Sequence, residues 1–585
     1  MADGANPTSQ WAELFVAALA HGGLTDVCIA PGSRSTPLTM AFVRQAGIQP
    51  HLHLDERSAG FFALGLALAT DRPVALVCTS GSAAANFHPA IVEAYMSAVP
   101  LLILTTDRPP ELRHSGANQT IDQVKMFANH VLWSADLALP EAAAPAVARR
   151  NLQTMAARAL AIARGQRPGP VHLNLPFRKP LEPALAPESA PPPPDAIRTE
   201  IQTGRIAPSA EQINELHQQI LAHERGLIVC GPGCPGGEFP AALARLARRS
   251  GYPICADPLS GLRFHPALAD SPVIASYESF LAGDREPGWA APELIIRFGA
   301  VPISKWLNSY LERQTAAERY HIRANGIWAD DSHLVQHFWQ LDEVLLCQAL
   351  SERLYPRPTT WQQCLTATEA HAVKALAEGR QTHWFDGAAV GAVLDALPEG
   401  WNLAMGNSLP VRHLDQFGAA SARRLHVYGN RGASGIDGNI STALGVAAGS
   451  GRPTVLVIGD ITFYHDMNGL FGLREVEAPV LIVLLNNNGG GIFRRLPIAA
   501  YEPEFTPWFL TPHGLDFSHA AALYGLPFAR VTGRPEFTAA LDTALASGTH
   551  QLIELQTDGA QDEATRRQIV RGVFEEKEEP RISTD

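Results

Sequence analysis

Short apolar runs rich in valine, isoleucine and leucine recur along the chain, and longer alanine-rich stretches with helical spacing separate them. The runs occupy residues 26–30, 74–78, 101–104 and 171–175 in the first third, 226–230, 294–298 and 326–329 in the middle, and 401–404, 454–458, 480–485 and 551–555 in the last third. Continuous apolar strands that alternate with helices are typical of parallel sheets covered on both faces. The pattern therefore predicts an α/β protein of three doubly wound, mainly parallel-sheet domains.

Two proline-rich breaks separate the three blocks. The first contains four consecutive prolines, 191–194, which neither a helix nor a central strand accommodates. The second lies at 355–359, after which helical spacing resumes through Trp361 and Leu365. The expected organisation is a first domain at 1–182, a proline-rich linker at 183–208, a central Rossmann-like domain at 209–355, a third domain at 356–573 and a charged tail at 574–585.

Charge and composition exclude several classes of function. The 46 basic and 58 acidic residues give a net charge of -12, which does not support broad binding to nucleic acid or to anionic membranes. No uninterrupted apolar segment reaches the ~18 residues of a membrane helix, and no basic and apolar leader opens the chain. The 7 cysteines are scattered and do not indicate a disulfide framework. We expect a cytoplasmic protein with neither a nucleic-acid nor a membrane partner.

Polar loops directly follow several of the predicted strands. They lie at residues 30–34, 79–82, 105–109, 459–460 and 486–489. Each loop alone is ordinary turn and helix-capping chemistry. In doubly wound sheets, however, ligands bind beyond the carboxyl ends of the strands. Their joint occurrence therefore indicates a binding edge.

The most specific pair of loops carries Asp460 and Asn487, which are separated by enough residues for one helix and one strand. Two neighbouring strand ends would then present a carboxylate, an amide oxygen and, at Gly489, an accessible backbone carbonyl. Oxygen ligands with open positions suit Mg²⁺, which commonly shares its coordination shell with phosphates. The spacing predicts a metal site that holds a diphosphate.

This pair of loops resembles the motif of thiamine-diphosphate enzymes, a Gly-Asp followed by an Asn-Asn. Further local matches lie at 30–38, 55–60, 107–112, 116–119, 430–438 and 487–493. Through them the chain resembles the 2-succinyl-5-enolpyruvyl-6-hydroxy-3-cyclohexene-1-carboxylate synthase (MenD) family, densely in the first and third blocks and thinly in the middle. The resemblance implies decarboxylation of 2-oxoglutarate on thiamine diphosphate and conjugate addition of the succinyl-semialdehyde carbanion to isochorismate, in menaquinone or phylloquinone biosynthesis.

The resemblance also implies roles for the domains and for individual residues. The first domain would bind the pyrimidine of the cofactor, with Glu56 as the catalytic carboxylate that shares a proton with the ring. Beside it, Asp55 is expected to be a helix cap or a solvated turn residue, and Arg57 a surface or interface ion-pair partner. The third domain would bind the diphosphate and Mg²⁺ or Mn²⁺, with Asp460, Asn487 and Gly489 as metal ligands. The implied cofactor contacts are Glu56, Gly435, Ile436, Gly459, Asp460, Ile461, Asn487, Gly489 and Ile492. Since the superfamily forms each site from two subunits, a homodimer or homotetramer is implied.

Both implied substrates are dicarboxylates, and guanidinium groups recognise carboxylates through paired hydrogen bonds. The substrate contacts implied by the resemblance are Ser33, Arg34, Arg108, Asn118, Gln119, Lys305, Ser408, Arg412 and Arg431, with Ile492, Phe493 and Leu496 as apolar walls. We therefore expect a basic cleft within an acidic chain.

Two alternatives stay open. One is another thiamine-diphosphate-dependent 2-oxo acid decarboxylase or carboligase. Ile461, where many such enzymes have glycine, and the absence of a His-His pair favour the MenD-like assignment. The other is a non-catalytic nucleotide-binding paralogue, because 231–236 reads G-x-G-x-x-G and Asp257 follows. Pro232 and Pro235 remove two backbone donors from that loop, which argues against it.

Overall fold

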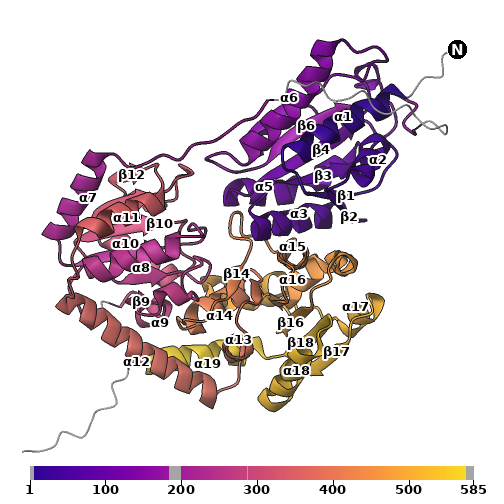
Figure 1. Cartoon of the computed structure of the whole chain (residues 1–585). Coiled ribbons are helices and arrows are strands. Elements are labelled where there is room, and N and C mark those ends of the chain that lie inside the picture. The colour runs from indigo at the N-terminus through magenta and orange to yellow at the C-terminus, as the bar shows by residue number, and fades with distance from the viewer. Residues whose placement is uncertain (1–5, 184–198, 286–287, 575–585) are drawn as a thin grey trace, which may run out of the picture. The chain divides into compact units, whose positions relative to one another are not determined.

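The computed structural model describes residues 6–183, 199–285 and 288–574, in which the strands form three six-stranded sheets (Figure 1). The first sheet has the order β2 (Gln49–Leu52), β1 (Asp26–Ile29), β3 (Val74–Cys78), β4 (Leu101–Asp107), β6 (Val171–Pro176), β5 (Trp133–Asp136). The second has the order β12 (His337–Trp339), β11 (Glu318–Ile322), β10 (Leu294–Phe298), β7 (Gly226–Cys230), β8 (Ile254–Ala256), β9 (Val273–Ile274). The third has the order β14 (His426–Tyr428), β13 (Asn402–Met405), β15 (Thr454–Gly459), β16 (Val480–Asn486), β18 (Gln551–Gln556), β17 (Phe528–Val531).

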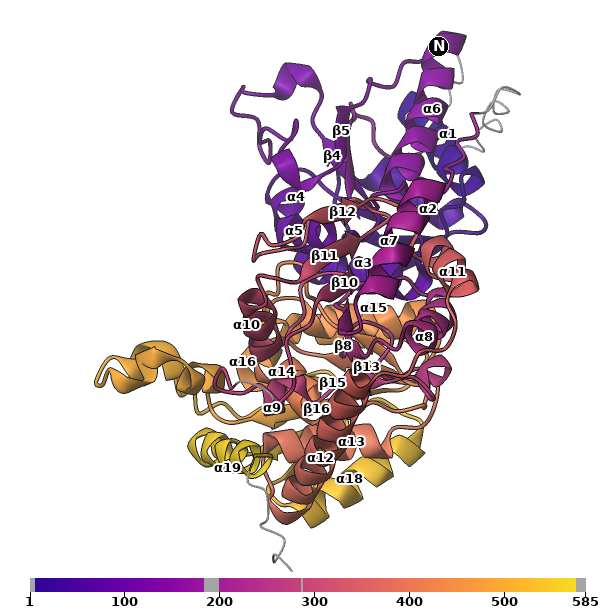
Figure 2. The ribbon, with the colours of Figure 1, turned by 90° about the vertical axis from the view of Figure 1, so that its left-hand side faces the viewer.

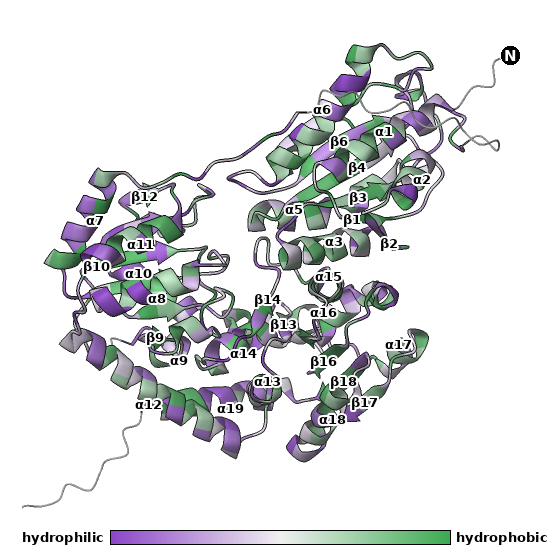
Figure 3. Ribbon diagram, in the orientation of Figure 1, coloured by the Kyte–Doolittle hydropathy of each residue, from purple (hydrophilic) through white to green (hydrophobic). Residues whose placement is uncertain are grey.

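The strands pair in parallel, and the central ones are buried along their whole length, as β3, β7 and β16 show. Figure 3 shows how hydrophobic the strands of the third sheet are. Their valine and isoleucine content suits a sheet that is covered on both faces. The predicted α/β class with three parallel sheets is confirmed.

One predicted strand is wrong. Residues 326–329 form no strand, because Gly326 adopts a left-handed φ of +66° in a turn, and the ring of Trp328 stacks on Phe338 instead. The strand of this region is β11, which ends at Ile322, four residues before Gly326. Its sequence, Glu-Arg-Tyr-His-Ile, includes buried Arg319 and His321, whose polarity hid it from the hydrophobic pattern.

The first sheet belongs to a compact unit formed by residues 1–204, 430–454 and 462–480. One face packs on α1 (Pro7–His21), α2 (Thr36–Arg44) and α6 (Ala146–Ala163); the other on α3 (Glu56–Thr70) and α5 (His88–Ser97). Further along, α15 (Asn439–Ser450) lies against α3 (Figure 1). Their backbones approach so closely that a Cβ on Gly65 would lie 2.1 Å from the Thr442 carbonyl oxygen. Glycine is therefore required there. The other helical segments of this unit are α4 (Ser82–Asn86), η1 (Pro110–Leu112), η2 (Ala128–His130) and η4 (Met467–Glu475).

The second and third sheets belong to the other unit, which consists of the described residues within 205–429, 455–461 and 481–585. The second sheet packs on α7 (Ala210–Ala222), α8 (Phe239–Ser250) and α11 (Glu343–Arg353) on one face and on α9 (Tyr277–Phe280), α10 (Lys305–Arg313) and α12 (Thr360–Thr382) on the other. One face of the third sheet packs on α13 (Asp386–Ala396), α14 (Leu409–Phe417) and α18 (Arg534–Ser547). Figure 2 shows α12 beside α19 (Gly559–Gly572). The remaining helical segments of this unit's described residues are η3 (Pro266–Leu268), η5 (Gly491–Arg495), η6 (Pro497–Ala500), η7 (Thr506–Leu510) and α17 (Ser518–Leu523). The short helix α16 (Asp460–His465) begins in this unit and ends in the first.

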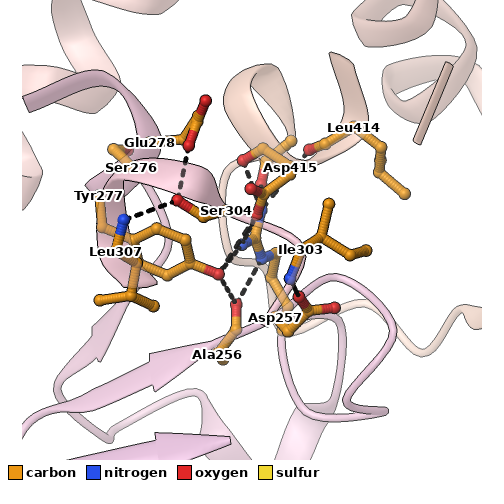
Figure 4. A network of polar contacts seen from close by, with 12 residues as sticks. Ala256, Asp257, Ser276, Tyr277, Glu278, Ile303, Ser304, Leu307, Leu414 and Asp415 are labelled. Carbon is orange, nitrogen blue, oxygen red and sulfur yellow. Dashed lines mark hydrogen bonds and ion pairs between the residues drawn. The ribbon is translucent and has the colours of Figure 1, made fainter. Parts of the chain in front are cut away.

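A buried ion pair between Arg263, which follows β8 of the second sheet, and Asp415 connects α14 to that sheet (Figure 4). The Arg263 side chain is fully buried, and its Nη2 donates to Asp415 Oδ1 at 2.7 Å and to the Tyr277 hydroxyl at 2.7 Å. Its Nε donates to the Ala256 carbonyl at 2.8 Å. Since a buried charge is costly to leave unpaired, this contact holds the second and third sheets in one arrangement.

Four of the seven cysteines lie in strands. Cys28, Cys78, Cys230 and Cys255 are buried in strands, and all seven cysteines are free thiols. Within the described ranges no helix is long and apolar enough to cross a membrane. The prolines 191–194 and the acidic end 575–585 lie outside the described residues, and the proposed domain limits stay predictions.

Candidate active site

The carboxyl edge of the first sheet holds Arg34 as a buried cation. Its backbone N–H donates to Thr79 Oγ1 at 3.2 Å, and its Nη1 donates to the Phe177 carbonyl at 2.7 Å. Only 6% of the residue is exposed, and within the described part of the chain its Nε has no hydrogen-bond partner. Burial, and then the positive charge of Arg108, lower the pKa of Arg34. A buried donor without a partner indicates that an acceptor binds here.

Arg108 follows β4 and donates to the Ser80 hydroxyl. Gln119 also contacts Ser80, since its Nε2 donates to the Ser80 carbonyl at 3.0 Å. A buried amide supports both loops: Gln123 accepts from the Gly81 N–H at 2.9 Å and donates to the Thr106 carbonyl at 3.1 Å. The predicted contacts Ser33 and Asn118 are exposed in the same loops. The structure thus brings these five predicted residues to one edge of one sheet.

Glu56 is the first residue of α3. Asp55 caps this helix, since its carboxylate accepts from the Arg57 N–H at 3.0 Å, and it also pairs with the Arg57 guanidinium at 2.6 Å. The expected cap and ion pair are both confirmed. Burial, and then the charge of Glu56, raise the pKa of the Cys78 thiol at the end of β3. Glu56 is partly buried, and its role stays a prediction.

The loop that carries Arg431, Gly435 and Ile436 is held by a carboxylate that the sequence did not indicate. Glu93 is 3% exposed and accepts three backbone N–H groups, from Gly432 at 2.6 Å, Ala433 at 2.7 Å and Ser434 at 3.2 Å. The Ser97 hydroxyl donates to it at 2.7 Å. A carboxylate that accepts several amide hydrogens is strongly bound, so Glu93 orders this loop.

Glu93→Ala is therefore expected to lower the thermal unfolding midpoint by several degrees and to raise the apparent dissociation constant for a cofactor bound by this loop. Each buried amide left unpaired costs ~1–3 kcal/mol. Scanning calorimetry measures the first effect and titration calorimetry the second. Glu141→Gln, an exposed change in the same unit, is the control. A Glu93→Ala protein with wild-type melting and binding would contradict this account.

In the other unit, Asp460 lies at the end of β15 and the first turn of α16. Its Oδ2 accepts from the Gly489 N–H at 2.9 Å, and its Oδ1 from the Ile461 N–H at 2.7 Å. The Nε2 of His513 lies 3.2 Å from Oδ2. The spacing argument from the sequence is thus matched by direct contact between the two predicted strand ends.

The groups around Asp460 fit a divalent metal ion. The Oδ1 of Asn487 is buried and has no hydrogen-bond partner among the described residues, which leaves a ligand oxygen available. Gly459 has open space where a side chain would lie, so a diphosphate can approach the backbone. Gly489 has a φ of +144°, and a Cβ there would lie 2.1 Å from the Leu510 carbonyl oxygen, so only glycine fits. No cluster of three or more His, Cys, Asp and Glu placed to bind metal occurs in the part of the chain that is described. The expected ligand set contains only one residue of those types.

Three residues of this unit that are predicted to contact the substrates lie near the start of two helices. Lys305 opens α10, and its ammonium lies 4.6 Å from the centre of the Trp306 ring. Arg412 lies on α14, where its Nη1 donates to the Ser408 carbonyl at 2.7 Å and burial lowers its pKa. Ser408 has a φ of +74°, a strained conformation that is often found at functional sites.

The predicted apolar walls lie in η5 and just after it. Ile492 and Phe493 are partly buried, and 48% of Leu496 is exposed, so these side chains are not ordinary core. The ring of Phe493 packs edge-on against Phe509, at 5.7 Å between centres. Apolar side chains left open beside polar groups fit a ligand-binding surface, although their role stays a prediction.

The glycine-rich loop after β7 is occupied by contacts within the protein. The Pro232 carbonyl accepts from the Ala300 N–H at 2.7 Å, and a Cβ on Gly231 would lie 1.8 Å from the Ala300 carbonyl oxygen. Asp257, the acidic residue that a dinucleotide site would need, is fully buried and accepts from the N–H groups of Leu259 and Ile303. These residues are structural.

Comparison with known proteins identifies the family. Models of the thiamine pyrophosphate enzyme N-terminal and C-terminal TPP binding domains match residues 10–126 and 410–555. A 2-succinyl-5-enolpyruvyl-6-hydroxy-3-cyclohexene-1-carboxylate synthase of Roseiflexus sp. (strain RS-1) is 54% identical over 96% of this chain and 97% of the relative. The chain belongs to the 2-succinyl-5-enolpyruvyl-6-hydroxy-3-cyclohexene-1-carboxylate synthase family. A family member from Geobacillus kaustophilus (strain HTA426) is 43% identical over 95% of this chain and 96% of its own.

Solved structures share the fold of this synthase family. A benzoylformate decarboxylase from Polynucleobacter necessarius superposes with a TM-score of 0.67 at 19% identity, covering 94% of this chain and 98% of its own. A putative thiamin diphosphate-dependent enzyme from Mycobacterium smegmatis gives a TM-score of 0.66 at 22% identity, covering 94% of this chain and 99% of its own. The three-sheet architecture therefore extends beyond the synthase family.

Sequence reasoning missed four residues that support the predicted site of this synthase family member. They are Glu93, Gln123, Glu278 and His513. Each lies outside the motifs that were recognised in the sequence, and each contacts a partner that is distant in sequence. Gln123 was adjacent to a recognised match, and its burial between loops was the only property that would have revealed it.

Proposed function

We propose that this chain decarboxylates 2-oxoglutarate and adds the resulting four-carbon fragment to isochorismate, forming 2-succinyl-5-enolpyruvyl-6-hydroxy-3-cyclohexene-1-carboxylate for menaquinone or phylloquinone biosynthesis. Membership of the synthase family supports the reaction. The observation that carries it in the structure is the contact of Asp460 with Gly489 beside the unpartnered Oδ1 of Asn487.

Thiamine diphosphate, when bound, supplies the carbanion-stabilising chemistry that decarboxylation and carbon–carbon bond formation require. Asp460, Asn487 and the Gly489 carbonyl would hold Mg²⁺ or Mn²⁺ with the diphosphate, while Gly459 and Ile461 would border it. Gly435 and Ile436 would contact the rest of the cofactor. Glu56 would exchange a proton with a pyrimidine nitrogen, and its partial burial suits that exchange.

The two carboxylates of each substrate would be bound by cations at two places. Arg34 and Arg108 lie at the carboxyl edge of the first sheet, and Lys305 and Arg412 lie in the other unit. Buried guanidinium groups with donors to spare bind carboxylates better than exposed ones, because water competes less. Arg431, on the loop that Glu93 holds, would add a further cation.

We propose a homodimer or homotetramer in the cytoplasm, in which different subunits contribute the pyrimidine-binding and diphosphate-binding parts of each site. Light scattering of the purified protein measures its mass in solution. A monomer that is fully active would contradict this assembly.

The reaction is tested by incubating the purified protein with 2-oxoglutarate and isochorismate, with and without thiamine diphosphate and Mg²⁺. We expect product and CO₂ only when both cofactors are present. Parallel reactions with pyruvate and benzoylformate test the alternative of another decarboxylase. Turnover without cofactor, or turnover of these two acids alone, would reject the proposal.

A further inference from the structure

Glu278 has no role in the proposed reaction, yet its carboxylate holds the start of the helix that carries Lys305. It lies on the short helix α9, and its Oε2 accepts from the Ser304 hydroxyl at 2.6 Å (Figure 4). The same oxygen accepts from the Trp306 N–H at 3.4 Å. Ser304 in turn caps α10 by accepting from the Leu307 N–H at 3.0 Å. The first turn of α10, and with it Lys305, is therefore fixed by Glu278.

Two partly buried cations interact with the same carboxylate. Glu278 is the strongest of the negative charges that offset the burial of Arg412, and it also interacts with Arg495 in η5. Arg495 has a carboxylate partner of its own, since its Nε donates to Glu563 at 3.0 Å. Arg412 forms no close ion pair with any carboxylate of the described residues. Its Nη1 donates to the Ser408 carbonyl, which carries no charge. The negative charges that act on Arg412 are therefore those of Glu278, first, and of Asp415.

We propose that Glu278 is a positioning residue of the substrate-carboxylate site: it fixes Lys305 through Ser304 and Trp306, and it offsets the charge of Arg412. This inference rests on the proposed function of Lys305 and Arg412. The Glu278 side chain then has two separable actions. Its hydrogen bonds order the site, and its negative charge limits how tightly an anion binds. Moderate affinity favours turnover, because an anion held by unopposed buried cations leaves slowly.

The two actions predict opposite effects of two substitutions. Glu278→Gln keeps an oxygen that can accept from Ser304 and Trp306 but removes the negative charge, so a dicarboxylate should bind roughly 3- to 10-fold more tightly. Glu278→Ala removes the hydrogen bonds as well, so the start of α10 loosens and binding should weaken roughly 10-fold. The KM for 2-oxoglutarate should follow the same signs. A residue with only a structural role would move both variants in one direction.

The measurement is titration calorimetry of the protein loaded with thiamine diphosphate and Mg²⁺, using glutarate as a dicarboxylate without a reactive keto group. Glu312→Gln, at the exposed far end of α10, is the matched control and should bind as wild type does. Equal or same-sign shifts in the two Glu278 variants would overturn the inference. Wild-type binding without turnover of 2-oxoglutarate and isochorismate would reject the proposed reaction but not this inference, whereas no glutarate binding by wild type would reject both.

The dependence on pH provides a second readout. Burial, and then the negative charge of Asp415, raise the pKa of Glu278 to about 7. The charged groups that act with it are Arg412 and Asp415 on α14 and Arg495 in η5, and Lys305 lies on α10, whose start Glu278 holds. Above this pKa Glu278 is charged and opposes anion binding; below it the opposition is lost. Wild-type affinity for glutarate should therefore rise from pH 8 to pH 6 towards that of Glu278→Gln, whose affinity should change less. A wild-type curve parallel to the variant's would contradict the electrostatic action.

Discussion

Glu56→Gln should reduce kcat by about 10²- to 10⁴-fold, the usual contribution of a positioned acid–base group. The amide has nearly the same shape, so α3, which Asp55 caps, should stay folded and the cofactor should still bind. What is lost is the ability to exchange a proton with the pyrimidine ring. Steady-state kinetics with 2-oxoglutarate and isochorismate measures the loss, and titration calorimetry with thiamine diphosphate and Mg²⁺ measures binding.

Glu141→Gln serves as the control for this substitution, because it makes the same chemical change at an exposed position of the same unit. It should leave both kcat and cofactor binding at wild-type values. Full activity of Glu56→Gln would remove Glu56 from the reaction. Loss of cofactor binding in that variant would instead assign Glu56 a binding role alone.

The hydrophobic pattern predicted the sheets wherever a strand is apolar on both faces. β16, with the sequence Val-Leu-Ile-Val-Leu-Leu-Asn, is such a strand, and burial along its whole length explains why it could be predicted. β11 could not be predicted in this way, because Arg319 and His321 occupy buried positions. The Arg319 Nη2 donates to the Gln314 carbonyl at 2.8 Å, and His321 Nε2 lies 2.9 Å from the Gly299 carbonyl oxygen. Buried polar side chains that hydrogen-bond to backbone carbonyls carry no signal in a local hydrophobic pattern.

The candidate site likewise contains residues that the sequence could place and residues that it could not. Asp460 and Gly489 could be placed together because topology alone brings the carboxyl ends of adjacent parallel strands to one edge. Glu93 and Glu278 could not, since each acts on a segment that is far away in sequence and each looks like an ordinary helical glutamate. Motifs therefore identified the groups proposed to touch ligands, whereas the groups that hold them in place became visible only in three dimensions.

Asp460→Asn should abolish the metal-dependent binding of thiamine diphosphate and reduce turnover by more than about 10³-fold, because the substitution removes the one carboxylate of the predicted ligand set. An amide of similar size can still accept from the Gly489 N–H, so the strand ends should stay together. In wild type, cofactor and Mg²⁺ at 100 times their dissociation constant should stabilise the fold by ~2.7 kcal/mol. Scanning calorimetry should show a rise in the unfolding midpoint for wild type and almost none for Asp460→Asn.

Asp542→Asn, on the exposed face of α18, is the matched control and should keep the full cofactor-dependent rise. Mg²⁺ alone and thiamine diphosphate alone are the further arms of the experiment. Because the metal and the diphosphate are expected to share one coordination shell, the rise should need both together in wild type. An Asp460→Asn protein that is stabilised as much as wild type would show that the metal is held elsewhere. If Asp460→Asn unfolds at the wild-type midpoint without ligands but shows no rise when they are added, Asp460 binds the metal rather than stabilising the fold.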